Sequence, residues 1–132
     1  MTDTKGYIYF GIKTDDASIT ISDFERYLTI KPTKFEQMFE RGHVPKSTNW
    51  RFSTDNLTNP YCYEEIEKLI TTLAPYKEEF KQLKQHYPQL YMVLEVVLFL
   101  GDETPGLNFS KRVLQFVNEL DAEIDCDIYN EK

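Results

Sequence analysis

The sequence predicts an α+β domain with a four-stranded, mainly antiparallel sheet that carries its helices on one face. Apolar and polar residues alternate near both ends of the chain, over residues 7–13 and 122–129, which indicates strands with one buried face. Between these segments, apolar residues recur at helical spacing over residues 62–87 and 109–120. At 132 residues the chain has the usual length of one domain, so we expect residues 1–132 to fold as a single unit.

The first third of the chain predicts two strands separated by two short helices. Residues 7–13 form the first strand, and Ser22 with Glu25 fits a capping box that begins a helix ending before Pro32. Residues 34–41 have apolar side chains at helical spacing, and Gly42 stands where a helix-ending glycine is expected, so we predict a second helix there. Residues 50–53 form a short second strand whose two aromatic side chains face inward.

The middle of the chain predicts two consecutive helices that pack on the same sheet. Asn59 and Pro60 favour a helix start, and an apolar stripe then runs from Cys62 to Leu73. Pro75 should break the helix at Ala74, because proline removes a backbone donor and clashes with the preceding turn. The stripe then resumes and continues to Tyr87.

The last third predicts a strand, a helix and a final strand. Residues 90–100 are apolar on both faces, as in a central strand, and residues 109–120 form an amphipathic helix. Residues 122–129 then alternate between a core face and an acidic face. The resulting order is strand–helix–strand, two helices, strand–helix–strand, which is loosely ferredoxin-like with a helical segment in place of the usual hairpin.

Composition and charge limit the classes of function. The net charge of −7 argues against nucleic-acid binding, which needs a concentration of Lys and Arg. Residues 1–6 lack the apolar core of a secretory signal, and the longest apolar run, residues 90–100, is too short for a membrane-spanning helix. Cys62 and Cys126 fit no metal or disulfide pattern and are expected to be free thiols, so we expect a cytoplasmic protein without a membrane segment.

No pattern of catalytic or ligating residues is recognisable. The two histidines, His43 and His86, have no Cys, His or carboxylate partner at ligand spacing, so we expect no metal site. Phosphate-binding and nucleophile-elbow motifs are absent from the sequence, and both cysteines fall on predicted core faces. We therefore expect no cofactor, no catalytic residues and no enzymatic activity.

The sheet face turned away from the helices is the candidate interaction face. It should combine aromatic and acidic side chains from the first strand, the central strand and the last strand: Tyr7, Tyr9, Tyr91, Glu95, Phe99, Glu123, Asp125, Asp127 and Tyr129. Mixed apolar and acidic surfaces of this extent usually contact something. Three interpretations remain open: an interface with a partner or second copy, cover by another segment of the same chain, and a ligand or cation site on Glu95, Asp125 and Asp127. Glu95, in an apolar strand, is the candidate for a raised pKa.

Several short segments carry a family resemblance. They are the opening strand Gly6–Ile12, the stretch Leu28–Thr33, Gly42, Trp50, the helix break Leu73–Lys77 and the ending Leu120–Tyr129. Together they resemble the bacterial "domain of unknown function 4279" family over essentially the whole chain. The resemblance implies a stand-alone bacterial cytoplasmic domain with no assigned catalytic residues.

The function expected from these features is a non-enzymatic protein-interaction module, of the kind found in immunity or inhibitor proteins. Acidic residues on the last strand would then steer association with a basic partner. The alternative is a small-molecule-binding regulatory domain, with its ligand between the sheet face and the mildly basic segment 31–51. Self-association through the same face is a further possibility that the sequence leaves open.

Overall fold

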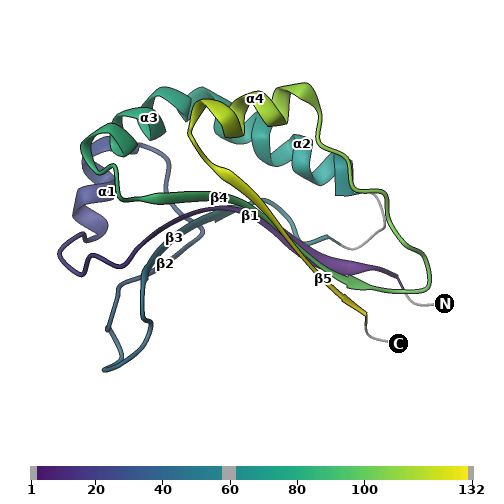
Figure 1. Ribbon diagram of the computed structural model, residues 1–132, viewed down its shortest axis with the longest axis horizontal. Coiled ribbons are helices and arrows are strands. Elements are labelled where there is room, and N and C mark those ends of the chain that lie inside the picture. Colours follow the sequence, from purple (N-terminus) through teal and green to yellow (C-terminus); the bar gives the residue numbers. More distant parts are fainter. Residues whose placement is uncertain (1–2, 58–61, 131–132) are drawn as a thin grey trace.

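A computed structural model describes residues 3–57 and 62–130 of the chain, and it contains one sheet with helices packed against it (Figure 1). The elements in chain order are β1 (Lys5–Thr14), α1 (Ile21–Tyr27), β2 (Lys34–Glu36), β3 (Thr48–Ser53), α2 (Cys62–Leu73), the 3₁₀ turn η1 (Ala74–Tyr76), α3 (Lys77–His86), β4 (Tyr91–Leu100), α4 (Lys111–Glu119) and β5 (Glu123–Asn130). The predicted α+β class is confirmed. The predicted strand count is wrong, because the sheet has five strands rather than four.

The sheet is mixed, with strand order β2-β3-β1-β4-β5. β1 lies at its centre and runs antiparallel to both β3 and β4, while β2 runs antiparallel to β3. β4 and β5 are parallel and are joined through α4. In a split, ferredoxin-like arrangement, a strand of the other unit would separate β4 from β5. Here they are direct neighbours, so the loose ferredoxin-like expectation fails at the level of strand order.

The helix predicted over residues 34–41 is the main error of the sequence interpretation. Its first residues form β2, where Phe35 pairs with Trp50 of β3. The ring of Phe35 packs edge-to-face on Phe24 of α1, with centroids 5.7 Å apart. A helix cannot continue through Phe39, whose φ is 62° and whose backbone N–H bonds to the Pro45 carbonyl. Strand pairing and the aromatic contact stabilise the extended conformation more than the helical spacing of so short a segment could stabilise a helix.

The helices α2, α3 and α4 lie along one face of the sheet, which arches beneath them, so that the other face forms its concave side (Figure 1). The apolar stripe of α2 is fully buried, as predicted from its spacing: Cys62, Ile66, Leu69, Ile70 and Leu73 are all 0% exposed. Pro75 lies in the 3₁₀ turn η1 that separates α2 from α3, which confirms the predicted break. The helix start predicted at Asn59 and Pro60 lies outside the described residues.

The helix ends differ slightly from those predicted. The first helix begins at Ile21 rather than after Ser22, because Asp23 accepts a 2.8 Å hydrogen bond from the Thr20 backbone N–H. α4 begins at Lys111, where the Ser110 hydroxyl accepts a 3.3 Å bond from the Val113 N–H.

Alternation in β1 and β5 is confirmed, although the two strands differ in how deeply they are buried. Ile8, Phe10 and Ile12 of β1 are at most 3% exposed and form the core beneath the helices. In β5 the corresponding face is only half-buried at Ile124 and Cys126, and Ile128 is 53% exposed. The far end of β5 lies away from the helices in Figure 1, in agreement with the exposure of Ile128.

Candidate interaction face

The side of the sheet without helices, called the open face below, gathers all the residues predicted for it. Strand register brings them together: Tyr9 lies opposite Glu95, which lies opposite Asp125. The neighbouring rows pair Tyr7 with Val97 and Asp127, Phe99 with Tyr129, Val93 with Glu123, and Lys13 with Tyr91. Because paired residues of adjacent strands point to the same side, all nine predicted side chains share this face.

The open face has a buried centre and an exposed rim. Glu95 is 7% exposed and Tyr9 is 8% exposed, although none of the described helices covers either of them. The rim is formed by Tyr7, Tyr91 and Tyr129, which are 40%, 39% and 51% exposed. Long aromatic side chains on neighbouring strands reach across the pleat and shield the centre from water. The centre of the face is therefore partly desolvated without cover from another element.

Four aromatic rings form a strip across β1, β4 and β5. Tyr7 stacks on Tyr9 with centroids 6.2 Å apart and planes inclined by 14°, and it meets Phe99 at 6.5 Å with planes at 49°. Phe99 stacks in turn on Tyr129 at 5.4 Å and 17°. The rings cover one another along the strip, and their outer surfaces at Tyr7 and Tyr129 remain exposed.

Three carboxyl groups converge beside this strip. Glu95 on β4 and Asp125 and Asp127 on β5 each offer an oxygen, and these oxygens lie within 4.8 Å of one another. The parallel register of β4 and β5 produces this arrangement, because it sets Asp125 directly opposite Glu95 and Asp127 one pleat further on. The two aspartates are two residues apart on β5, and Glu95 brings the third carboxyl from the neighbouring strand.

Burial and crowding change the protonation of Glu95. Desolvation, followed by hydrogen bonds with Asp125 and Asp127 and by their negative charges, raises the pKa of Glu95 to about 8. At neutral pH the side chain is therefore largely protonated and can donate a hydrogen bond to a neighbouring aspartate. A cation placed among the three groups would favour the ionised form and displace this proton.

The carboxyl cluster suits positively charged ligands. Oxygen ligands are the ones that Ca²⁺ and Mg²⁺ prefer, and the spacing of these oxygens allows them to surround one such ion. The ammonium or guanidinium group of a basic side chain is equally suited to carboxylates beside aromatic rings. In the part of the chain that the structure describes, no Lys or Arg nitrogen lies within 4.0 Å of a carboxylate oxygen of Glu95, Glu123, Asp125 or Asp127.

Arg51 is the residue of the open face that sequence reasoning missed. It lies on β3 opposite Gly11, and its guanidinium carbon sits 4.6 Å from the centre of the Tyr9 ring. Gly11 leaves room for the ring, because a Cβ there would come within 2.9 Å of Tyr9. Arg51 follows Trp50, which faces inward, so alternation alone places it on the outer face. Its contact with Tyr9 depends on strand register and could not be predicted from the sequence.

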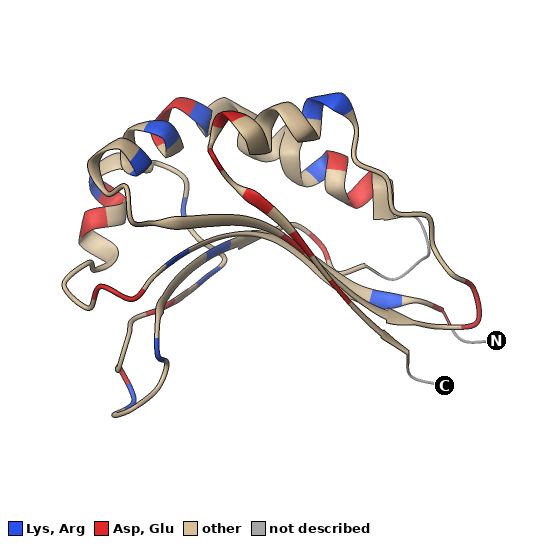
Figure 2. Ribbon diagram, viewed as in Figure 1, with Lys and Arg blue, Asp and Glu red and all other residues tan. Residues whose placement is uncertain are grey.

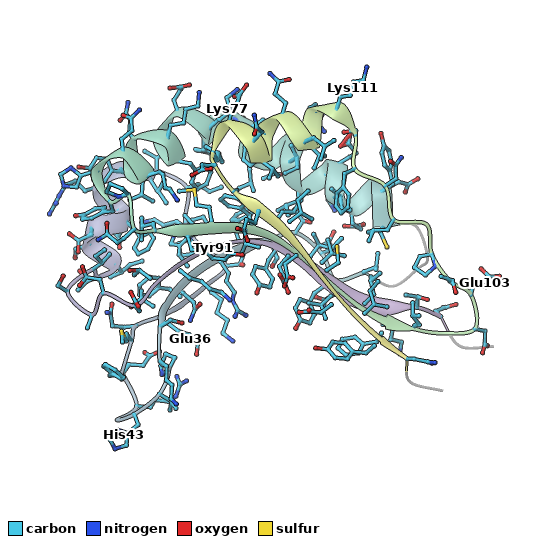
Figure 3. The ribbon with its side chains drawn as sticks, in the orientation of Figure 1. Glu36, His43, Lys77, Tyr91, Glu103 and Lys111 are labelled. Atoms are coloured by element: carbon cyan, nitrogen blue, oxygen red, sulfur yellow. The ribbon has the colours of Figure 1, made fainter. Side chains whose placement is uncertain are left out.

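Charge on the open face is divided between its two sides. Acidic residues follow β5, while Lys34 on β2 and Arg51 on β3 lie at the opposite side of the sheet (Figure 2). The Tyr91 hydroxyl donates a 2.9 Å hydrogen bond to Glu123 on the acidic side. Burial and this bond raise the pKa of Tyr91 to about 12. Figure 3 shows Tyr91 on the open side of the sheet and His43 at the distant tip of the β2–β3 loop.

A shallow hollow of about 370 Å³ adjoins the aromatic strip at one end of β1. It is lined by Lys5, Gly6, Tyr7, Asn56, Leu57 and Phe99. Gly6 allows β1 to lie close to β4 here, since a Cβ at this position would approach the Val97 carbonyl oxygen to 2.0 Å. The hollow is mainly apolar, and its lining includes the rings of Tyr7 and Phe99, which contact each other at 6.5 Å.

No histidine belongs to the carboxyl cluster of Glu95, Asp125 and Asp127, and Cys126, which lies between the two aspartates on β5, points to the other face of the sheet. His86 packs against the rings of Tyr27 and Tyr87, with centroids 5.3 Å and 4.6 Å away. Cys62 and Cys126 are both free, and burial raises the pKa of each thiol. A thiol with a raised pKa is a poor nucleophile at neutral pH, so neither cysteine has the environment of a reactive one.

Comparison with known proteins assigns the chain to one family. Over residues 3–57 and 62–130, the helices are all too short or too polar to cross a membrane. No curated protein and no solved structure matches the chain significantly. The model of the family described as "Domain of unknown function (DUF4279)" matches residues 4–131, as the resemblance of the short segments implied. The chain therefore belongs to the DUF4279 family.

Proposed function

We propose that this protein is a non-enzymatic interaction module whose open face binds a basic region of a partner protein. One observation carries the proposal: the acidic side chains of β5 lie beside exposed aromatic rings on a sheet face that no described helix covers. Tyrosine and phenylalanine are favoured at the centres of protein interfaces, while uncompensated charge is expensive to bury there unless the partner supplies the opposite sign.

Charge complementarity supports a basic partner rather than a neutral one. Glu123, Asp125 and Asp127 lie in a row along one strand, and no described Lys or Arg forms an ion pair with them. A Lys or Arg from a partner would meet these carboxylates and the ring of Tyr129 at once. The net charge of −7 would also accelerate the encounter with a basic protein.

Charge reversal on β5 tests this function. A partner is first captured with the wild-type protein and purified, and its direct binding is then measured by calorimetry. We expect the D125K/D127K variant to bind at least tenfold more weakly, because it replaces attraction with repulsion at the centre of the interface. The matched control is E78K/E103K, which has the same net charge but places its lysines on exposed residues of α3 and the β4–α4 loop.

The two variants separate local contact from overall charge. Weaker binding by D125K/D127K and normal binding by E78K/E103K would support the open face as the binding site. Equal binding by wild type and D125K/D127K would exclude it. Equal loss in both variants would show that only the net charge of the protein matters, which would also contradict the proposal.

The hollow beside Tyr7 supports a second candidate, a small-molecule-binding regulatory domain. Its apolar lining, which includes the rings of Tyr7 and Phe99, suits a small organic ligand. A metabolite screen by thermal melting tests this candidate, with Phe99→Ala as the variant that removes one wall. Thermal melting is preferred to Trp50 fluorescence for this screen, because Trp50 is 1% exposed and packs on Phe80 beneath the helices. A screen in which no compound raises the melting temperature of the wild type would remove this candidate.

A further inference from the structure

We propose that the basic partner binds by adding a strand to the free edge of β5. This inference rests on the proposed function and specifies how the open face is used. The occupant is an extended segment of another protein, about eight residues long, in which basic residues alternate with apolar ones. Three features of the molecule lead to it: the length of the β5 edge, the charges along it and the chemistry of its two faces.

β5 presents a long outer edge, which is available for pairing from Glu123 to Tyr129. It is the last strand in the sheet order, and it pairs with β4 along eight residues, from Glu123 to Asn130. From Glu123 to Tyr129, no backbone hydrogen bond joins β5 to any described segment other than β4. On a strand paired on one side only, alternate N–H and C=O groups point outward and can pair with another chain.

The opposite edge of the same sheet is protected, which makes the β5 edge unusual. β2 has three residues, is preceded by Pro32, and carries Lys34 and Glu36 in an ion pair of 3.9 Å. Short length, lysine and a nearby proline are common means of preventing edge-to-edge pairing. β5 contains none of Pro, Gly or Lys, and from Glu123 to Tyr129 about 23 Å of backbone is available for pairing at the usual rise per residue.

The acidic residues of β5 decide which kind of strand fits. A second copy of β5 would bring its own carboxylates opposite Asp125 and Asp127, and like charges directly across a strand pair are destabilising. A strand with Lys or Arg at alternate positions would place its cations next to the same carboxylates. The charges that oppose self-pairing thus favour a basic partner.

The other face of β5 favours a partner strand with apolar residues between its basic ones. Ile124, Cys126 and Ile128 point to the side of the sheet that carries the helices, and Ile128 is 53% exposed. Apolar side chains on an added strand would extend this half-covered surface below α4 and shield Ile128. Peptide recognition by strand addition works in this way, with backbone bonds for affinity and alternate side chains for selectivity.

The test uses an acetylated and amidated eight-residue peptide of alternating Lys and Val, kept below the concentration at which it associates with itself. We expect saturable binding to the wild-type protein with a dissociation constant below about 1 mM. Amide hydrogen exchange should slow at β5 and not at β2. A peptide with Glu in place of every Lys has the same strand pattern and should not bind.

Backbone methylation separates strand addition from simple charge attraction. In two further peptides, the backbone nitrogens are methylated, at every Val in one peptide and at every Lys in the other. Each modification blocks backbone pairing along one edge of the peptide and keeps its charge. We expect at least one of them to lose binding at least tenfold. If both bind as well as the parent peptide, or if the parent does not bind, the inference is overturned.

Variants of β5 complete the design and keep the two proposals distinguishable. D125N/D127N preserves side-chain size and should weaken binding of the Lys–Val peptide at least fivefold, whereas E78Q/E103Q should not. Peptide binding without protection of β5 amides would overturn strand addition, while the charge-reversal experiment with the native partner would still decide the proposed function. A wild-type dimer with protected β5 amides would assign the edge to a second copy and also overturn the inference.

Discussion

The two faces of this sheet each carry a cluster of aromatic rings, and the clusters differ in geometry. Beneath the helices, Phe10 meets Phe80 edge-to-face with centroids 5.2 Å apart, and Trp50 meets Phe80 at 5.8 Å in the same manner. On the open face, Phe99 and Tyr129 stack almost in parallel at 5.4 Å. Rings in the core are contributed by helices as well as strands, whereas those of the open face come from strands alone.

This difference shows which cluster serves the fold. In the core, the rings of Phe10 and Phe80 are enclosed on all sides and are 0% exposed. Stacked rings on the open face cover one another only along the strip, so the outer ring keeps one side in contact with water. The covered cluster should therefore determine stability, while the open cluster should matter for binding. The predictions below test that division, beginning with the largest expected effect.

Removing the ring of Phe80 should cost more stability than any other change considered below. Phe80 fills the space between α3 and the sheet, and Phe80→Ala leaves a cavity that neighbouring helices cannot readily close. We expect a loss of about 3–5 kcal/mol in the free energy of unfolding, measured by urea denaturation. A loss below about 1 kcal/mol would contradict the assignment of the covered cluster to stability.

Filling the space above Gly11 should have an intermediate effect. A Cβ at this position would approach the Tyr9 ring to 2.9 Å and the Val93 side chain to 3.4 Å. Gly11→Ala should displace the Tyr9 ring and its contact with Arg51, at a cost of about 1–3 kcal/mol. The control is Gly106→Ala, because a Cβ there has no heavy atom within 4 Å. Equal stability of the two variants would show that the Tyr9 ring can move without cost.

Local patterns predicted the strands and helices better than they predicted the contacts between them. Alternation in residues 122–129 correctly placed the acidic residues of β5 on one face, because side-chain direction in a strand depends only on the local backbone. Helical spacing likewise identified α2, α3 and α4. The exception was β2, where Phe35, Met38 and Phe39 satisfied a helical pattern over too few residues to outweigh a tertiary contact.

The carboxyl cluster depended on information that is not local. Glu95 and Asp125 are thirty positions apart, and they meet because β5 pairs in parallel with β4 rather than at another edge. Glu95 stands in an apolar strand segment of the sequence, which is why its raised pKa could be anticipated. The contact of Arg51 with Tyr9 had no sequence signal beyond the outward position of Arg51, because it requires the exact register of β1 and β3.

The protonation of Glu95 should make stability depend on pH. Its folded pKa of about 8 lies above the ordinary value of 4.5, so the folded state keeps a proton that the unfolded state releases. The wild-type protein should therefore lose stability as the pH rises from about 4.5 to about 8. Glu95→Gln has no such proton to lose and should gain roughly 1–3 kcal/mol relative to the wild type between pH 5 and pH 9.

Thermal melting of both proteins across this pH range, with a chelator present, measures the effect. The chelator matters because a bound divalent cation would keep the three carboxyls ionised and hide the slope. Asp55→Asn is the matched control, since Asp55 is an exposed carboxyl paired with Lys68 and its pKa is lowered rather than raised. A constant difference between Glu95→Gln and the wild type at all pH values would contradict the protonated state of Glu95.

The smallest effect on stability is expected at the outer end of the aromatic strip. Tyr129 stacks on Phe99 but is 51% exposed, so Tyr129→Ala should lower the free energy of unfolding by less than about 1 kcal/mol. Its effect on partner binding should be larger, because exposed tyrosines that become buried in an interface are often major contributors to affinity. Urea denaturation of the variant measures its free energy of unfolding, and calorimetry measures its affinity for the partner. A Tyr129→Ala variant that is strongly destabilised would mean that the open cluster, like the covered one, is part of the fold rather than a surface kept for a partner.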